Sequence, residues 1–154
     1  MPTAPEQILL DLIAAGEPFE ATSRDGAISL RVESWIPCVG AAIHHGHRLR
    51  PELSNRCLLT EDERLQEEDP YTGDLIAAMP ITLVANDSRY EYDLNRPLAR
   101  CVYDEAWGRK VWERTLNRVQ RQRSHAKHKA FYRVLSALID EIERRFGACL
   151  VIDV

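Results

Sequence analysis

The segment 88–97 (SRYEYDLNRP) gathers side chains that can bind a carboxylate. Arg89, Asp93, Asn95 and Arg96 all fall within eight residues. Arg presents a planar donor fork that matches a carboxylate in bidentate geometry, and Asn adds a neutral donor and acceptor. The segment therefore predicts a site for a small anionic molecule. The alternative is a plain strand with surface ion pairs, such as Arg89 with Asp93.

Three histidines, His44, His45 and His47, directly follow the apolar run 36–43. A neutral imidazole is the commonest transition-metal ligand. The spacing of His44 and His47 suits two ligands around one ion, in a turn that Gly46 permits. Two ligands are fewer than the three protein ligands that a catalytic zinc takes. The alternative is a group of loop histidines that are solvated or that cap the backbone.

An acidic run, EDERLQEEDPYTGD at 61–74, contains seven acids and one base. Such a run is typical of a solvated helix face. Glu61, Glu63, Asp69 and Asp74 are alternative candidates for a metal ligand or a general base.

The segment 107–133 has the opposite charge, with nine Lys or Arg and a single acid. Four aromatic residues are interleaved with these charges: Trp107, Trp112, Phe131 and Tyr132. A basic face with aromatics is one way to bind nucleic acid. We favour the other interpretation, in which basic side chains line the solvent side of helices while the aromatics pack inward.

Composition limits the class of protein. The chain has 154 residues, 45% of them hydrophobic, and a formal net charge of -4. This length is enough for one globular domain with a core, and the charge excludes a global nucleic-acid footprint. No apolar run reaches the roughly 20 residues of a membrane span. Four widely spaced cysteines without a CxxC pattern indicate a reducing, cytoplasmic setting.

The elements that must position these residues follow from periodicity. We expect strands alternating with helices, which predicts an α/β domain whose ligands gather at the carboxyl ends of strands. A capping box is expected where Thr60 precedes Glu63 by three residues. The expected helices are 5–15, 104–123 and 128–146, the last ended by Gly147, and the expected strands are 28–32, 36–43, 81–85 with 90–94 beside it, and 149–154; 48–60 is expected to be a loop.

Four segments in this order and spacing resemble the N-formylglutamate amidohydrolase family over residues 36–154. They are AIHHGHRLRPEL (42–53), LTEDERLQEEDPYTGDL (59–75), SRYEYDLNRP (88–97) and CLVIDV (149–154). The family is similar to zinc carboxypeptidases and aspartoacylases. The resemblance implies a single domain over 1–154, with a phosphorylase/hydrolase-like fold of three layers, α/β/α, around a mixed sheet.

The resemblance also implies roles for the carboxylate-binding segment. Asn95 and Arg96 look like the pair that holds the free carboxylate of the substrate. Arg89 is similar to the arginine that polarises the scissile carbonyl and stabilises its oxyanion, an electrostatic role that often carries much of catalysis. Asp93 is expected to orient one of these side chains.

For the metal, the resemblance implies zinc bound by His44, with His47 at the position where the wider superfamily has an acidic ligand. In the family, the strand similar to 149–154 leads to a histidine that completes the metal site, and this sequence stops at Val154. We therefore expect an N-terminal part of a longer protein. Its last strand would expose an edge that either a missing C-terminal segment or a second copy covers.

The expected function is metal-dependent hydrolysis of an N-formyl or N-acyl amide bond in a small carboxylate-bearing substrate, such as an N-acyl amino acid. The alternative is a non-catalytic binding or regulatory module that keeps the Asn-Arg pair without a complete metal site. A third hypothesis is an RNA-binding or assembly module that uses the segment 107–133. No membrane partner is expected.

Overall fold

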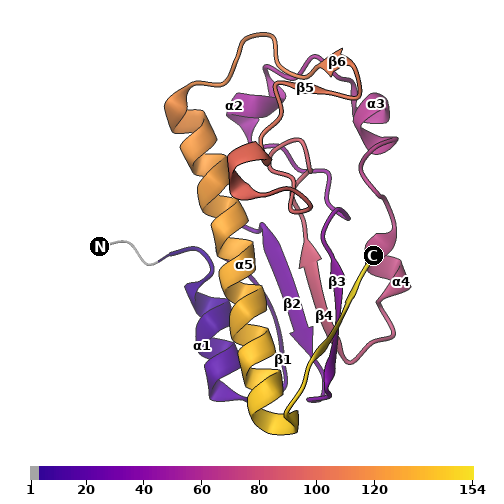
Figure 1. Ribbon diagram of the computed structural model, residues 1–154, viewed down its shortest axis with the longest axis vertical. Coiled ribbons are helices and arrows are strands. Elements are labelled where there is room, and N and C mark those ends of the chain that lie inside the picture. Colours follow the sequence, from indigo (N-terminus) through magenta and orange to yellow (C-terminus); the bar gives the residue numbers. More distant parts are fainter. Residues whose placement is uncertain (1–3) are drawn as a thin grey trace.

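The computed structural model describes residues 4–154 and contains a mixed sheet, a small hairpin and several helices (Figure 1). The helices are α1 (Gln7–Ala15), α2 (Pro51–Ser54), α3 (Glu61–Leu65), α4 (Thr72–Leu75), the short 3-10 helix η1 (Leu98–Arg100) and α5 (Arg118–Phe146). The strands are β1 (Phe19–Thr22), β2 (Ile28–Val32), β3 (Cys38–Ala42), β4 (Ile81–Ala85), β5 (Glu105–Ala106), β6 (Arg109–Lys110) and β7 (Leu150–Asp153).

The main sheet has the strand order β1-β2-β4-β3-β7. Strand β2 pairs antiparallel with β1 and with β4, whereas β3 pairs parallel with β4 and with β7. The sheet is therefore mixed, as expected. Because β3, β4 and β7 run in the same direction, their carboxyl ends meet at one edge, where α/β folds usually place ligands.

Helices α1 and α5 cover one face of this sheet (Figure 1). Strand β2 shows why, because Ile28, Leu30 and Val32 are buried while the alternate Ser29 and Arg31 are half-buried. Helix α5 presents one apolar stripe to the same core. Its fully buried residues there are Phe131, Val134, Leu138 and Ile142.

The other face of the sheet carries the segment around α4. At Gly40 in β3 the approach is very close, since a Cβ there would lie 2.7 Å from Met79 Sδ and 2.9 Å from Ile76 Cβ. Arg31 of β2 fixes the same segment by donating to the carbonyls of Ala77 at 2.5 Å and Met79 at 3.1 Å. Among the described residues this second layer consists of short helices and turns, so the three-layer arrangement stays a prediction.

Several predicted elements are confirmed. Helix α1, strands β2, β3, β4 and β7, and the carboxyl half of α5 lie where periodicity placed them. The Thr60–Glu63 capping box forms at the start of α3, with both reciprocal hydrogen bonds present. Gly147 ends α5 with φ of 81°, a left-handed conformation that glycine adopts without steric cost.

Other predictions are wrong. Residues 104–123 are not one helix: a hairpin and a loop precede α5, which begins after Asn117 with its own capping box to Gln120. Val111 and Trp112 are buried in that loop, so tertiary packing overrides the local helical pattern. Residues 90–94 form buried turns and not a strand, and the predicted loop 48–60 contains α2. Strand β1 was not predicted.

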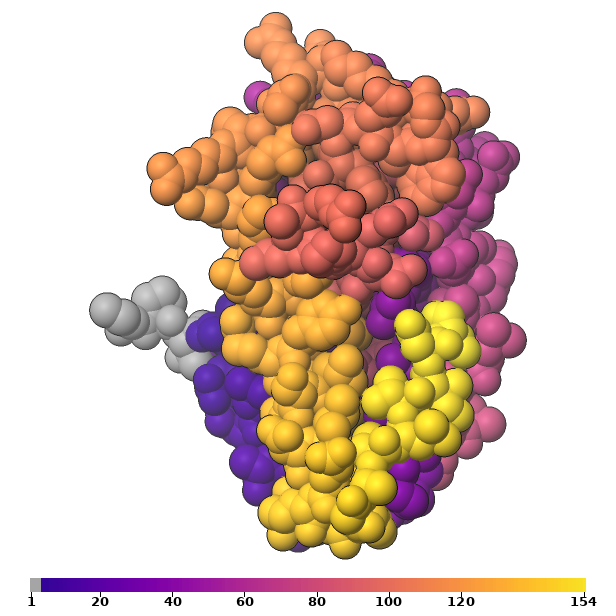
Figure 2. Space-filling model, viewed as in Figure 1, coloured from indigo at the N-terminus to yellow at the C-terminus, as the bar shows by residue number. Residues whose placement is uncertain are grey.

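Strand β7 lies at the edge of the sheet and is largely exposed. Leu150, Val151 and Ile152 are 60%, 37% and 40% exposed. Figure 2 shows this segment in yellow, running over the surface beside α5. Among residues 4–154, β7 pairs with β3 alone, as the sequence predicted for an apolar edge strand. No helix in this part of the chain is both long and apolar enough to cross a membrane.

Candidate functional site

The candidate site lies where β3 and β4 end. Strand β3 leads within two residues to His44, and β4 leads to the turns that contain Arg89 and Asp93. The two strands are parallel neighbours, so segments far apart in sequence come together. The structure thus brings three of the predicted site residues into direct contact.

Asp93 is the centre of this cluster and is fully buried. Its Oδ1 lies 2.8 Å from His44 Nε2 and accepts the backbone N–H of Asn95 at 2.7 Å. Its Oδ2 accepts Arg89 Nη2 at 3.0 Å and the hydroxyl of Tyr103. Four partners on one carboxylate leave it no freedom to rotate, so Asp93 orients the side chains around it.

The same contacts hold Asp93 in its ionised form. Burial by itself would raise its pKa, because a charge loses solvation. Hydrogen bonds from His44 and Tyr103 and the charge of Arg89 outweigh burial, and the pKa of Asp93 falls well below its usual range. The carboxylate therefore stays charged at neutral pH.

Arg89 is held at its two terminal nitrogens. Nη1 donates to the carbonyl of Glu67 at 2.8 Å and lies 3.5 Å from Asp69 Oδ2, while Nη2 binds Asp93. Burial disfavours the guanidinium charge, but Asp93 more than compensates and raises the pKa of Arg89. Its Nε is buried and has no hydrogen-bond partner. A buried N–H without a partner is rare, so this donor is available to a ligand.

His44 lies between two carboxylates. Its Nε2 faces Asp93, and its Nδ1 lies 3.2 Å from Oδ2 of Asp69, which is 55% exposed. Asp153 of β7 is also near, since burial raises the pKa of Asp153 while His44 partly counteracts that effect. Three elements of the fold therefore converge on one imidazole.

His47 makes a different contact. Its Nδ1 lies 2.9 Å from Oε2 of Glu68, a carboxylate that is 1% exposed. Arg64 donates to the other oxygen of Glu68 at 3.2 Å, and the Ser88 hydroxyl binds there as well. The predicted pair His44 and His47 thus serves two separate carboxylates.

Asn95 and Arg96 are exposed beside the cluster. The backbone of Asn95 is fixed by Asp93, and the carbonyl of Arg96 lies 3.0 Å from Nε2 of His128 in α5. Arg96 lines a pocket of about 270 Å³. The other residues that line this pocket are Tyr103, Glu105, Ala106 and Trp107. The predicted carboxylate-binding pair is therefore in reach of a small molecule.

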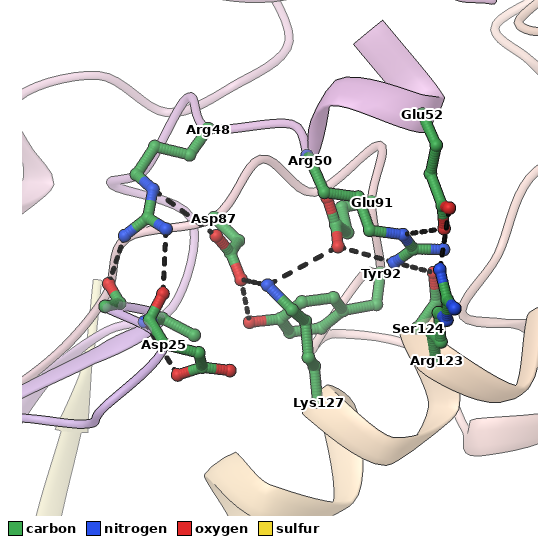
Figure 3. Close-up of polar contacts among 12 residues, drawn as sticks. Asp25, Arg48, Arg50, Glu52, Asp87, Glu91, Tyr92, Arg123, Ser124 and Lys127 are labelled. Carbon is green, nitrogen blue, oxygen red and sulfur yellow. Dashed lines mark hydrogen bonds and ion pairs between the residues drawn. The ribbon is translucent and has the colours of Figure 1, made fainter. Parts of the chain in front are cut away.

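A second buried network positions the segment from behind (Figure 3). Glu91 accepts the backbone N–H of Arg50 at 2.8 Å and its Nη1 at 2.6 Å. Lys127 of α5 lies 2.7 Å from Asp87 and 3.5 Å from Glu91, and Tyr92 donates to Asp87 at 3.0 Å. Asp87 and Glu91 thus tie the segment to α2 and α5.

Sequence reasoning proposed surface ion pairs here as the alternative. The Arg89–Asp93 pair does form, but Asp93 is 0% and Arg89 11% exposed, so it is a buried pair. Sequence reasoning did not assign roles to Asp87 or Glu91. Their signal is the alternation of charges, because Asp87 and Glu91 face α5 while Arg89 and Asp93 face His44.

The comparisons with known proteins now bear on this geometry. A family model described as N-formylglutamate amidohydrolase matches residues 36–154, which include every residue of the two networks described above. This chain belongs to the N-formylglutamate amidohydrolase family. The match covers more than half of the chain, so the predicted family is confirmed.

A solved structure supports the fold of this family member. The crystal structure of N-formylglutamate amidohydrolase from Ralstonia eutropha JMP134 superposes with a TM-score of 0.75 at 17% sequence identity. The match covers 82% of this chain and 55% of that one, so this chain spans about half the length of that relative. At this identity the likeness shows the fold alone. A comparison with curated proteins finds no significant match.

The acidic run of this amidohydrolase-family chain divides into different roles. Asp69 reaches His44, as described above. Glu63 caps α3 and lies 2.9 Å from Arg109, whereas Glu61 and Asp74 are exposed. Only one of the four acidic candidates therefore contacts the cluster around Asp93.

The basic segment 107–133 is largely neutralised by ion pairs along α5. Arg121 lies 2.6 Å from Asp104, and Arg123 lies 2.7 Å from Glu52. Of the four interleaved aromatics, two are buried (Trp112 and Phe131) and two are exposed (Trp107 and Tyr132). This arrangement favours a solvated helix face over a nucleic-acid surface.

Zinc, which the family resemblance implied, does not fit the described residues by themselves. No group of three or more His, Cys, Asp or Glu side chains within residues 4–154 is placed to hold a metal ion. The best pair, His44 Nδ1 and Asp69 Oδ2, offers two donors, and catalytic zinc takes three. The roles of His44 and His47 as ligands stay predictions, and no reaction step below uses zinc.

We expect the 154-residue chain to bind Zn²⁺ weakly, because two donors leave most of the coordination to water. Equilibrium dialysis followed by mass spectrometry of metal content measures this directly. His44→Ala and His47→Ala should then have the same low zinc content as the parent chain. Stoichiometric zinc that His44→Ala removes would contradict the expectation and would establish His44 as a ligand.

Proposed function

We propose that this chain binds a small N-acyl amino acid by its free carboxylate and takes part in hydrolysis of the acyl amide bond. Family membership supports the reaction class. The observation that carries the proposal is Arg89, a buried cation with one unpartnered donor beside the exposed Arg96. Because the chain spans about half of its solved relative, the complete reaction is part of the proposal.

Arg96 is assigned to the substrate carboxylate. Its side chain lines the pocket and is exposed, so a carboxylate reaches it without displacing a protein partner from a buried site. A guanidinium binds a carboxylate through two parallel hydrogen bonds, which fixes the orientation of the substrate as well as its position. Asn95, also exposed, adds a neutral donor next to it.

Arg89 is assigned to the scissile carbonyl. Its terminal nitrogens are already bound to protein oxygens, and this leaves the N–H at Nε for the substrate oxygen. Asp93 keeps the guanidinium in place before any substrate arrives. Donors that are oriented in advance stabilise a developing oxyanion more than mobile ones, because the site does not reorganise during the reaction. Asp93 and Tyr103 act here as positioning residues.

A non-catalytic binding module is the second candidate. The observation in its favour is that the described residues contain no complete metal centre, while the carboxylate-binding residues are all present. The two candidates predict the same binding and differ in turnover. Release of formate from N-formyl-L-glutamate by the chain supports hydrolysis. Binding with no formate released supports the binding module.

Arg96→Ala is expected to weaken binding of N-formyl-L-glutamate by about 10- to 100-fold in isothermal titration calorimetry. The reason is loss of a charge-assisted hydrogen-bonded pair, which is worth about 1.5–3 kcal/mol. Arg100→Ala is the matched control, since it removes an equally positive, exposed side chain four residues away. Equal affinity of Arg96→Ala and the parent chain would overturn the carboxylate assignment.

A further inference from the structure

The turn of the β5–β6 hairpin has an unusual sequence. Ala106 pairs with Arg109, so Trp107 and Gly108 form a two-residue turn, with φ of 51° and 74°. Positive φ at both central residues is the pattern of a type I′ turn, which strongly favours Asn-Gly. A bulky residue with positive φ is an outlier, and such conformations concentrate at functional sites. The tryptophan is therefore not explained by the turn.

The surroundings of Trp107 hold its ring in one place. Tyr103 and Tyr90 contact it edge-on, with ring centroids 5.7 Å and 5.9 Å away. The guanidinium carbon of Arg89 lies 5.1 Å from the ring centroid, in range of a cation–π contact. Trp107 is nevertheless 49% exposed. A fixed aromatic ring that remains half in solvent, beside the proposed oxyanion donor, is suited to contact a ligand.

The ring also forms one wall of the pocket that Arg96 lines. Tyr103 and Ala106 add apolar surface, and Glu105 adds a carboxylate. A substrate whose carboxylate binds Arg96 would place its side chain against these walls. A flat apolar side chain would bury surface against Trp107 and Tyr103. A second carboxylate on the substrate would instead approach the like charge of Glu105.

We propose that Trp107 and Tyr103 form an apolar subsite beside Arg96, which makes this chain prefer N-acyl amino acids with an aromatic side chain over those with an acidic one. This inference rests on the proposed function, because it uses Arg96 as the carboxylate anchor. It goes beyond that function by naming the class of side chain that the site selects.

The test compares N-formyl-L-phenylalanine with N-formyl-L-glutamate by calorimetry on the full chain. The two compounds share the formyl group and the α-carboxylate, so their affinity ratio reports the side-chain subsite alone. We expect the parent chain to bind the phenylalanine compound at least about tenfold more tightly, as apolar pockets discriminate on this scale. Trp107→Phe should retain most of this ratio.

Trp107→Asn is the decisive variant. It creates the Asn-Gly pair that a type I′ turn favours, so the hairpin should form at least as well and the melting temperature should not fall. The affinity ratio should nonetheless fall to about one, because the aromatic wall is gone. A ratio that persists in Trp107→Asn would overturn the subsite.

Failure of the subsite and failure of the proposed function give different results. If the parent chain binds both compounds equally, and Arg96→Ala weakens both, the subsite is wrong and the carboxylate anchor stands. If neither compound binds the parent chain, the proposed function fails and this inference fails with it.

Discussion

Asp93→Ala is expected to lower the free energy of unfolding by about 3–5 kcal/mol, the usual effect of breaking a buried ion pair from one side. Arg89 would remain buried without its counter-charge, and His44 and Tyr103 would lose their common acceptor. Urea denaturation followed by circular dichroism measures the change. Substrate binding should weaken as well, because Arg89 would no longer be held in position.

Asp104→Ala is the matched control for this change. Asp104 also pairs with an arginine, Arg121 at 2.6 Å, but its side chain is 53% exposed. Exposed ion pairs contribute about 0–1 kcal/mol, so this variant should unfold close to the parent chain. Equal effects of the two variants would show that the network around Asp93 does not stabilise the fold.

The contribution of Asp93 to stability should also depend on pH. Its pKa is lowered in the folded chain, whereas the unfolded chain has an ordinary aspartate with a pKa of about 3.9. The contribution is therefore fully present above about pH 4 and is lost progressively as the pH falls further towards the folded-state value. The stability difference between the parent and Asp93→Asn should shrink over that acid range.

Glu91→Ala should lower the free energy of unfolding by a similar amount, about 3–5 kcal/mol. Glu91 is fully buried and accepts both the backbone and the side chain of Arg50, with Lys127 close by (Figure 3). Its removal leaves a cation unpaired and a backbone N–H unsatisfied. The same denaturation experiment measures the change.

Glu52→Ala is the control for Glu91→Ala, because Glu52 contacts the same Arg50 at 2.7 Å but is 34% exposed. Solvent screens this pair, so its loss should have a much smaller effect. A loss below about 1 kcal/mol for Glu91→Ala would mean that the segment 86–94 is positioned without the Arg50–Glu91 pair.

Much of the fold follows from local pattern. Alternation of apolar and polar residues located β2, and the strong apolar runs located β3, β4 and β7, because burial on a sheet selects these patterns whatever surrounds them. The long apolar stripe of α5 and the glycine that ends it were equally visible. These are signals in which neighbouring residues carry the information themselves.

Other elements could not be found in this way. The hairpin at 105–110 and the buried loop at Val111 and Trp112 depend on partners far along the chain, such as the bridge between Cys57 and Trp112. Nothing in the local sequence marks Trp107 for a left-handed turn, since that conformation is normally taken by Asn or Gly. Tertiary contacts outweigh intrinsic preference at these positions.

The sequence alone determined the chemical types of the site: Arg89, Asp93, Asn95 and Arg96 within one short segment, and histidines after a buried strand. Residue type and spacing are properties of the chain and need no fold. Only the tertiary structure decided that Asp93 joins His44 to Arg89, that His47 serves Glu68, and that Trp107 lies over Arg89. Those contacts arise because parallel strands bring distant segments to one edge of the sheet, a relation that no local pattern encodes.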